Sequence, residues 1–218
     1  MARKARPDVE ERVDSLVDWL ELHSRQLMFG SIGLLLIAGG FWFYRHSNEK
    51  QAQSASMALS ESETAIASGN LPLAQSGLEK LVQRYGSTPS GAQARVLLAQ
   101  VHFEKGEYQE GMKELEPVTN DKDAYTAAAA LNLTGAALEQ SGKYAEAAAT
   151  YQKAAARAPY NTDRDIYMAS AARALTSAGK LEEARKIWSE LAKDDQSPAS
   201  AEARVRLGEL EAKSGTAG

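Results

Sequence analysis

The sequence predicts an all-α fold: a solenoid of about four helix pairs plus a capping helix, preceded by one transmembrane helix. Three observations support this prediction. Alanine, the residue with the highest helix propensity, is abundant, and aromatic residues make up only 7% of the chain. Residues 27–44 contain no charged residue. Glycines recur every 36 or 37 residues after position 69, and a fixed period of this length is typical of helical repeat arrays.

The composition narrows the classes of function. The 218 residues suffice for one or two domains. They include 25 basic and 29 acidic residues, so the net charge of -4 gives no basic surplus for binding nucleic acid. Cysteine is absent, which excludes disulfides, thiolate metal sites and cysteine nucleophiles but is compatible with any compartment.

Residues 27–44 (LMFGSIGLLLIAGGFWFY) are predicted to form a membrane anchor. About 20 apolar residues cross a bilayer, and aromatic residues favour the membrane–water interface, as in Phe41–Tyr44 at the second end of the stretch. A cleaved signal peptide fits less well, because 26 residues with six acids precede the stretch and no small-x-small site follows it directly. A soluble core helix would seldom end in an aromatic cluster between cations such as Arg25 and Arg45. We therefore expect contact with membrane lipid through a retained anchor.

The flanking cations predict the orientation of this anchor. Two basic residues, Arg45 and Lys50, lie in the twenty positions after the stretch. Five precede it: Arg3, Lys4, Arg6, Arg12 and Arg25. The positive-inside rule then places the N-terminus in the cytoplasm and residues 45–218 on the other side of the membrane.

The segment before the anchor, residues 1–26, is predicted to be a cytoplasmic amphipathic segment. Its apolar residues recur at helical spacing: Val9, Val13, Leu16, Val17 and Leu20. Such a helix could lie at the membrane face or dock a partner, or it could be a short solvated helix that continues from the anchor.

Glycines within the anchor suggest a possible packing seam. Gly30, Gly33 and Gly40 fall near one face of a helix and could let another transmembrane helix approach closely. The alternative is that glycine is simply common in membrane helices.

After a juxtamembrane helix or linker at residues 45–54, a repeat domain is predicted over residues 55–214, followed by a disordered tail at 215–218. Each unit has one helix before its glycine and one after it. The glycines are Gly69, Gly106, Gly142 and Gly179. They are expected to form the turns, because glycine tolerates positive φ. Residues 199–213 have the polar character expected of a capping helix.

In each unit, a set of three residues that follow the glycine is predicted to pack the helices together. A small residue comes first: Ala74, Gly111, Ala147 or Ala184. A large residue comes four positions later: Leu78, Leu115, Tyr151 or Trp188. An apolar residue comes three positions later again: Leu81, Val118, Ala154 or Leu191. Small residues let helices touch and large ones fill the gap to the next pair. In the second unit, Pro117 is expected to shorten the second helix.

This pattern resembles the tetratricopeptide repeat. The third unit matches the signature spacing of that family at Leu131, Gly135, Leu138, Ala147, Tyr151, Ala154 and Pro159. The period of 36 or 37 residues is slightly longer than the usual 34. The resemblance implies a tetratricopeptide-repeat solenoid.

No enzyme signature is visible in the sequence. It contains no P-loop, HExxH or GxSxG motif and no pair of metal ligands at helical spacing. Asp163 and Asp165 fit a helix start better than a metal site. We therefore predict no catalytic residue, no metal, no cofactor and no small-molecule substrate.

An array of this kind is suited to binding other proteins, because its first helices line a concave face. The predicted partner-binding groove consists of Gln100, Phe103, Asn132, Ala136, Glu139, Ile166, Ala169 and Arg173. Their mixture of polar and apolar side chains would suit an extended segment or a helix of a partner. The alternative is that these positions are merely solvated helix faces.

The layout of the chain is similar to that of the YfgM-type ancillary subunits of the bacterial Sec translocon. The similarity covers an acidic N-terminal helix, one glycine-containing anchor with aromatic residues at its end, and the junction AQSASMAL at residues 52–59. The resemblance implies a single-pass protein of the bacterial inner membrane with a periplasmic repeat domain. It also implies partners among translocon components, chaperones or client polypeptides. The alternative is a structural or assembly subunit of another inner-membrane complex.

Overall fold

The structure, a computed structural model, describes residues 10–215, except for the side chains of residues 10–27, 29–37, 44 and 213–215. The described residues form nine α-helices, one 3-10 helix and no strand. The helices are α1 (Glu10–Ala67), α2 (Leu71–Tyr85), α3 (Pro89–Glu104), α4 (Tyr108–Leu115), η1 (Glu116–Val118), α5 (Ala124–Gln140), α6 (Tyr144–Arg157), α7 (Asn161–Ser177), α8 (Leu181–Lys193) and α9 (Ser200–Gly215). The chain divides into two compact units, Met1–Gln51 and Ala52–Gly218, and the boundary falls within α1.

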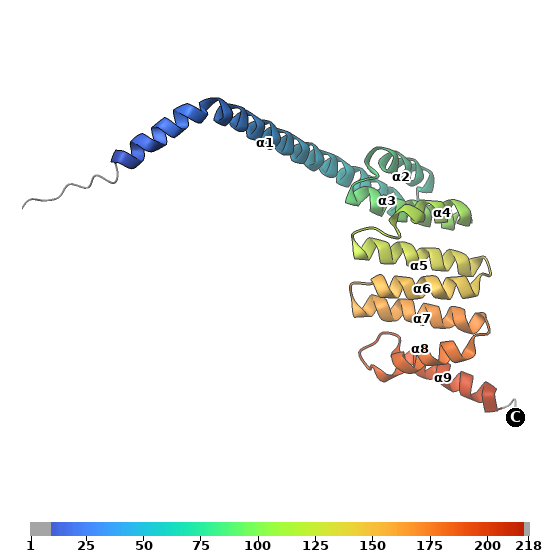
Figure 1. Cartoon of the computed structure of the whole chain (residues 1–218). Coiled ribbons are helices and arrows are strands. Elements are labelled where there is room, and N and C mark those ends of the chain that lie inside the picture. Colours follow the sequence, from blue (N-terminus) through green and yellow to red (C-terminus); the bar gives the residue numbers. More distant parts are fainter. Residues whose placement is uncertain (1–9, 216–218) are drawn as a thin grey trace, which may run out of the picture. The chain divides into compact units, whose positions relative to one another are not determined.

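The second unit is a stack of helix pairs followed by a last helix. Each pair has an opening helix (residues 52–67 of α1, then α3, α5 and α7) and a closing helix (α2, α4, α6 and α8). Figure 1 shows α5, α6, α7 and α8 lying one below another, with α9 against α8. The predicted all-helical solenoid of four pairs and a capping helix is therefore confirmed.

The same turn joins the two helices of every pair. Gly69, Gly106, Gly142 and Gly179 have φ of 72°, 78°, 74° and 76°, and within the described part of the chain no other type of residue has positive φ. At the third turn the amide of Gly142 donates to the carbonyl of Glu139 at 2.9 Å, and that of Lys143 to the carbonyl of Leu138 at 2.9 Å. This pair of hydrogen bonds is the Schellman motif, which satisfies the carbonyl groups at the end of a helix and favours glycine. The predicted role of the four glycines is confirmed.

Replacing a turn glycine should cost stability even where space is free. No atom lies within 4 Å of a Cβ built at Gly142, so Gly142→Ala tests the left-handed backbone alone, at a cost of about 1–2 kcal/mol. Gly208→Ala is the matched control, because Gly208 lies within α9 with equally open surroundings and should gain up to about 1 kcal/mol from helix propensity. Thermal unfolding followed by circular dichroism measures both. Equal effects of the two substitutions would contradict the assignment of this turn.

The periodic positions form the core. All twelve of the small, large and apolar positions that follow the turn glycines are buried. Nine of the twelve belong to clusters that link neighbouring helices, such as Leu78 and Leu81 of α2 with Leu59 of α1. The largest cluster contains Tyr151 and Trp188 and joins α6, α7, α8 and α9. Burial of this apolar surface holds successive pairs together.

The second pair departs from its neighbours as expected from Pro117. Helix α4 ends at Leu115, and Pro117 lies in the following 3-10 helix, where its missing amide hydrogen costs little. Arg95 of α3, at a position where the repeat expects a large apolar residue, instead reaches Glu114 of α4 at 2.8 Å. An ion pair thus replaces an apolar contact within this pair.

The predicted anchor at residues 27–44 is helical, since it falls within α1. The side chains of residues 27, 29–37 and 44 lie outside the described residues. Where side chains are described, no helix is long and apolar enough to span a membrane. Three adjacent aromatic side chains, Phe41, Trp42 and Phe43, are described, and 66–70% of their surface is exposed.

Candidate functional site

Two hollows are lined mainly by the opening helices and by α9, and together we call them the groove. The apolar hollow has a volume of about 310 Å³ and lies between α1, α3 and α5. It is lined by Glu63, Gln93, Val96, Leu97, Tyr125, Thr126 and Ala129. Tyr125 leaves 56% of its surface exposed although it is aromatic. Exposed aromatic side chains of this kind are favoured at protein interfaces.

The second hollow of the groove, the charged hollow, also has a volume of about 310 Å³. It lies between α5, α7, α8 and α9 and is lined by Glu139, Arg173, Thr176, Ser177, Trp188, Arg206, Glu209 and Leu210. Arg173 donates to Glu202 of α9 at 2.8 Å and to the hydroxyl of Ser170 at 2.9 Å. Arg206 donates to Glu209 at 3.0 Å. These ion pairs are partly exposed and therefore weak, so a partner can exchange them at little cost.

A hydrogen bond from the core fixes Glu139, one of the two acids that line the charged hollow. The hydroxyl of Tyr151 donates to Oε2 of Glu139 at 2.9 Å, from α6 to α5. Burial, and then this bond to a carboxylate, raises the pKa of Tyr151 above its ordinary value, so the phenol keeps its proton. Tyr151 packs against Gly135, where a Cβ would lie 2.8 Å from the ring. The small residue thus lets the tyrosine reach Glu139.

The N-cap of α5 lies beside the apolar hollow and is also well formed. Asp123 accepts hydrogen bonds from the hydroxyl of Thr126 at 2.6 Å and from its amide at 2.9 Å. These two bonds hold the pKa of Asp123 below its ordinary value, because they favour the charged carboxylate. The cap defines where α5 begins and so where Tyr125 and Thr126 present their side chains.

The structure brings two of the predicted groove residues together. Glu139 and Arg173 line the charged hollow. Gln100 and Ile166 are exposed on α3 and α7, and Asn132 and Ala136 are half-buried on α5. These four line neither hollow.

The other two predicted groove residues belong to the packing of the helices. Ala169 is 2% exposed and lies in the core cluster of α6–α9, so it offers no surface to a partner. Phe103 is half-buried and packs within its own pair, with its ring 5.9 Å from that of Tyr108 and close to Gly111. The glycine of α4 makes room for the phenylalanine ring, which therefore turns away from the groove.

Three of the groove residues that sequence analysis missed are Val96, Ala129 and Thr176. Each lies one repeat period from a predicted residue, and Ala129, for example, precedes Ile166 by 37 positions. Moving every predicted position by one period along the array would have found all three. The same shift reaches the capping helix, since Arg206 follows Ala169 by 37 positions and Glu209 follows Arg173 by 36.

Other predicted features give no reactive constellation. In the part of the chain that the structure describes, no three His, Cys, Asp or Glu side chains are grouped to hold a metal ion. Asp163 lies in the first turn of α7, as expected for a helix start. Of the predicted transmembrane seam, Gly30 and Gly33 lie outside the residues whose side chains are described, and a Cβ at Gly40 would meet nothing within 4 Å.

Stacked helix pairs with a shared glycine turn and a groove on their opening helices define a helical-repeat protein of the tetratricopeptide class. The model of the tetratricopeptide repeat-like domain matches residues 18–158, and that of the tetratricopeptide repeat matches residues 138–207. The first match covers more than half of the chain, which therefore belongs to the tetratricopeptide repeat-like family. No curated protein matches the chain.

Solved structures share the fold at low sequence identity. A tetratricopeptide repeat protein from Parabacteroides merdae is 12% identical with a TM-score of 0.60, over 74% of this chain and 61% of that one. The repeats of a putative kinesin light chain from Podospora anserina are 17% identical with a TM-score of 0.60, over 76% and 89% of the two chains. A double mutant of MamA from RS-1 is 15% identical with a TM-score of 0.53, over 73% and 96%. Such similarities establish the fold alone.

Proposed function

We propose that this protein is a membrane-anchored adaptor whose repeat domain holds other proteins in the groove. The observation that carries the proposal is the groove itself, which has an apolar hollow over α3 and α5 and a charged hollow over α7 and α9. Tetratricopeptide repeat domains generally bind other proteins, and the groove offers the mixture of apolar contact and polar orientation that such binding needs.

The proposed anchor is residues 27–44. The uncharged sequence is long enough to cross a bilayer as a helix, and the structure makes it part of α1. The exposed aromatic side chains Phe41, Trp42 and Phe43 support the proposal, because a run of this kind is unfavourable in water and favourable at a membrane interface. Five cations before the segment and two after it favour a cytoplasmic N-terminus and a periplasmic repeat domain.

The proposed setting is the bacterial inner membrane, where the adaptor assists the Sec translocon and periplasmic chaperones. This part of the proposal is supported by the resemblance of the layout and of residues 52–59 to YfgM-type subunits. The groove adds a physical reason, since an extended client polypeptide could place apolar side chains over the apolar hollow and polar ones over the charged hollow.

Affinity purification of the full chain in a mild detergent, with identification of the co-purifying proteins, tests the proposal. We expect translocon components or periplasmic chaperones, and loss of most of them with the groove variant Tyr125→Glu. The side chain of Tyr125 lines the apolar hollow and is 56% exposed, so the substitution should leave the fold intact. Val205→Glu is the matched control, because Val205 is 61% exposed on α9 and lines neither hollow.

The outcomes separate the alternatives. Stoichiometric recovery of a different inner-membrane complex would favour an assembly subunit over a translocon adaptor. Partners that remain bound to the groove variant as well as to Val205→Glu would contradict binding in the groove. Release of the unmodified chain from membranes by carbonate washing would contradict the anchor.

A further inference from the structure

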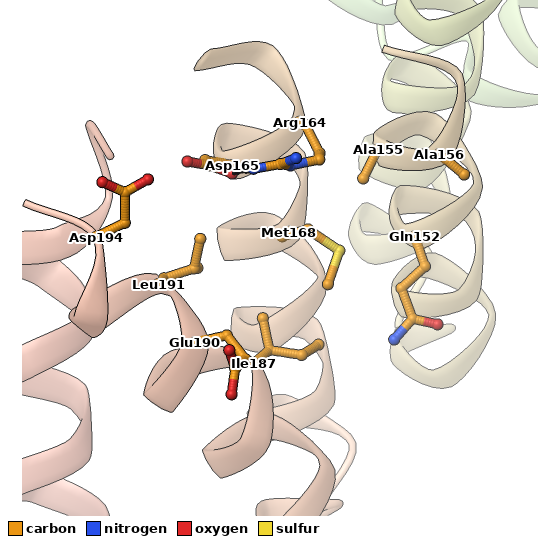
Figure 2. Close-up of a pocket in the computed structure, with 10 residues that line it drawn as sticks. All are labelled: Gln152, Ala155, Ala156, Arg164, Asp165, Met168, Ile187, Glu190, Leu191 and Asp194. Carbon is orange, nitrogen blue, oxygen red and sulfur yellow. Dashed lines mark hydrogen bonds and ion pairs between the residues drawn. The ribbon is translucent and has the colours of Figure 1, made fainter. Parts of the chain in front are cut away.

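A third pocket lies near the start of α7, away from the charged hollow at the end of that helix, and we call it the outer pocket. It has a volume of about 430 Å³ and is built by α6, α7 and α8. Its lining is drawn in Figure 2: Gln152, Ala155, Ala156, Arg164, Asp165, Met168, Ile187, Glu190, Leu191 and Asp194. The outer pocket uses Arg164, Asp165 and Met168 near the start of α7, whereas the charged hollow uses residues 173, 176 and 177 near its end, and the two share no lining residue. The outer pocket is therefore separate from the groove.

The inner wall of the outer pocket is apolar. Ile187 and Leu191 of α8 are buried members of the core, and Met168 of α7 packs against the same cluster. Ala155 of α6 closes the opposite side. A ligand that fills the pocket must therefore bring hydrocarbon as well as any polar group.

A buried carboxylate contributes to this wall. Asp165 is 5% exposed, and its Oδ1 accepts hydrogen bonds from Nε and Nη2 of Arg164, both at 3.1 Å. No hydrogen bond reaches its Oδ2 from the described residues, and Figure 2 shows the carboxylate turned toward the side of Asp194. The side chain of Arg164 is 49% exposed, so its attachment to a sequence neighbour can loosen when another donor arrives.

Two further acids make the pocket negative. Asp194, at the end of α8, is held in place by the amide of Gln196, which donates to its Oδ1 at 2.9 Å. Glu190 pairs with Lys193 at 2.7 Å, and both side chains are largely exposed. Three acids and one base thus line the pocket, with Lys193 outside it.

We propose that the outer pocket binds an arginine side chain of a partner polypeptide. The aliphatic stem of arginine matches Met168, Ile187 and Leu191, and its planar guanidinium can donate to Asp165 and Asp194 from one fork. Gln152, exposed at the rim on α6, carries an amide that can both donate to and accept from the backbone of a bound segment. A polypeptide can make this backbone contact, whereas a small guanidinium compound without a peptide backbone cannot.

Methionine methyl resonances of the full chain in mild detergent give a direct readout. The chain has five methionines, and Met168→Leu identifies the signal from the pocket. The probe is the peptide acetyl-Leu-Arg-Leu-amide, with acetyl-Leu-Gln-Leu-amide as its uncharged counterpart. We expect a saturable shift of the Met168 signal with the arginine peptide and at least tenfold weaker binding of the glutamine peptide.

Two substitutions that each remove one negative charge from α8 test where the arginine peptide binds. Glu190→Gln should weaken binding of the arginine peptide severalfold, whereas Glu182→Gln, an exposed acid elsewhere on α8, should leave it unchanged. Asp165→Asn should weaken it at least tenfold. Because Glu190 is exposed, its variant keeps the test valid even if Asp165→Asn fails to fold.

Three results would overturn the proposal. Equal binding of the arginine and glutamine peptides would exclude recognition of the charge, and equal loss from Glu190→Gln and Glu182→Gln would exclude the pocket as the place of binding. Agmatine carries the guanidinium without a peptide backbone, so agmatine that bound as tightly as the peptide would exclude a polypeptide as the preferred ligand.

Discussion

Ala147→Glu is expected to lower the free energy of unfolding by about 3 kcal/mol or more, because it buries a charge without a partner. Ala147 is the small residue of the third pair and is fully buried, in the core cluster that joins α6 to α9. The new carboxylate would either force the helices apart or take up a proton in the core. The expected result is a much lower midpoint of thermal unfolding of the full chain in detergent, followed by circular dichroism.

Ala149→Glu is the control for this substitution. It makes the same chemical change two residues later in α6, where the side chain is exposed and Lys153 follows one turn on. A glutamate four residues before a lysine is mildly favourable in a helix, so the midpoint should stay or rise slightly. Equal melting of Ala147→Glu and Ala149→Glu would show that Ala147 does not lie where two helices touch, and the repeat register would then be wrong.

Trp188→Ala is expected to cost about 3–5 kcal/mol, the range for removing a large aromatic side chain from a core. Trp188 is 1% exposed and is the largest of the fully buried side chains in the described residues. It fills the space between α8 and its neighbours and also lines the charged hollow. Its loss should leave a cavity beneath the capping helix and loosen the hold on α9.

Amide hydrogen exchange, together with denaturant unfolding, measures this effect. We expect faster exchange in α9 with Trp188→Ala, and an intermediate loss of stability with Trp188→Phe, which keeps part of the ring volume. If Trp188→Ala lowered the free energy of unfolding by only about 1 kcal/mol, the Trp188 side chain would not be packed in this core as described.

The sequence alone predicts the pair architecture well, because its causes are local and repeated. A positive φ is needed at one position per turn, and glycine supplies it at Gly69, Gly106, Gly142 and Gly179. The small and large residues that follow each glycine keep the same register, so burial at Ala147 and Tyr151 follows from the period. Pro117 predicts the short α4 for an equally local reason.

Contacts specific to one pair could not be predicted from the period. Arg95 pairs with Glu114, and Phe103 fills the space left by Gly111, although their periodic equivalents behave differently. Gly91 is a further case, since a Cβ there would lie 2.1 Å from the backbone oxygen of Tyr85. This close approach of the chain between α2 and α3 depends on how the first two pairs meet, which no local pattern records.

The groove was predicted only in part for a similar reason. A helical face can be assigned from the register, as for Glu139 and Arg173, but the exposure of each residue depends on the neighbouring helices. Ala169 is covered by its surroundings, whereas Tyr125, outside the predicted set, remains largely exposed. The outer pocket required the structure, because Gln152, Asp165 and Asp194 are far apart in sequence and belong to three elements.

Helix α5 is the one element that contributes to both hollows of the groove, with Tyr125 and Ala129 near its start and Glu139 near its end. A bound segment long enough to occupy both must therefore cross α5, and its direction matters. The apolar end of the segment should lie over α1 and α3, and its charged end should lie over α7 and α9. The reversed segment would press hydrocarbon against two arginines, so the array should distinguish a peptide from the same peptide read backwards.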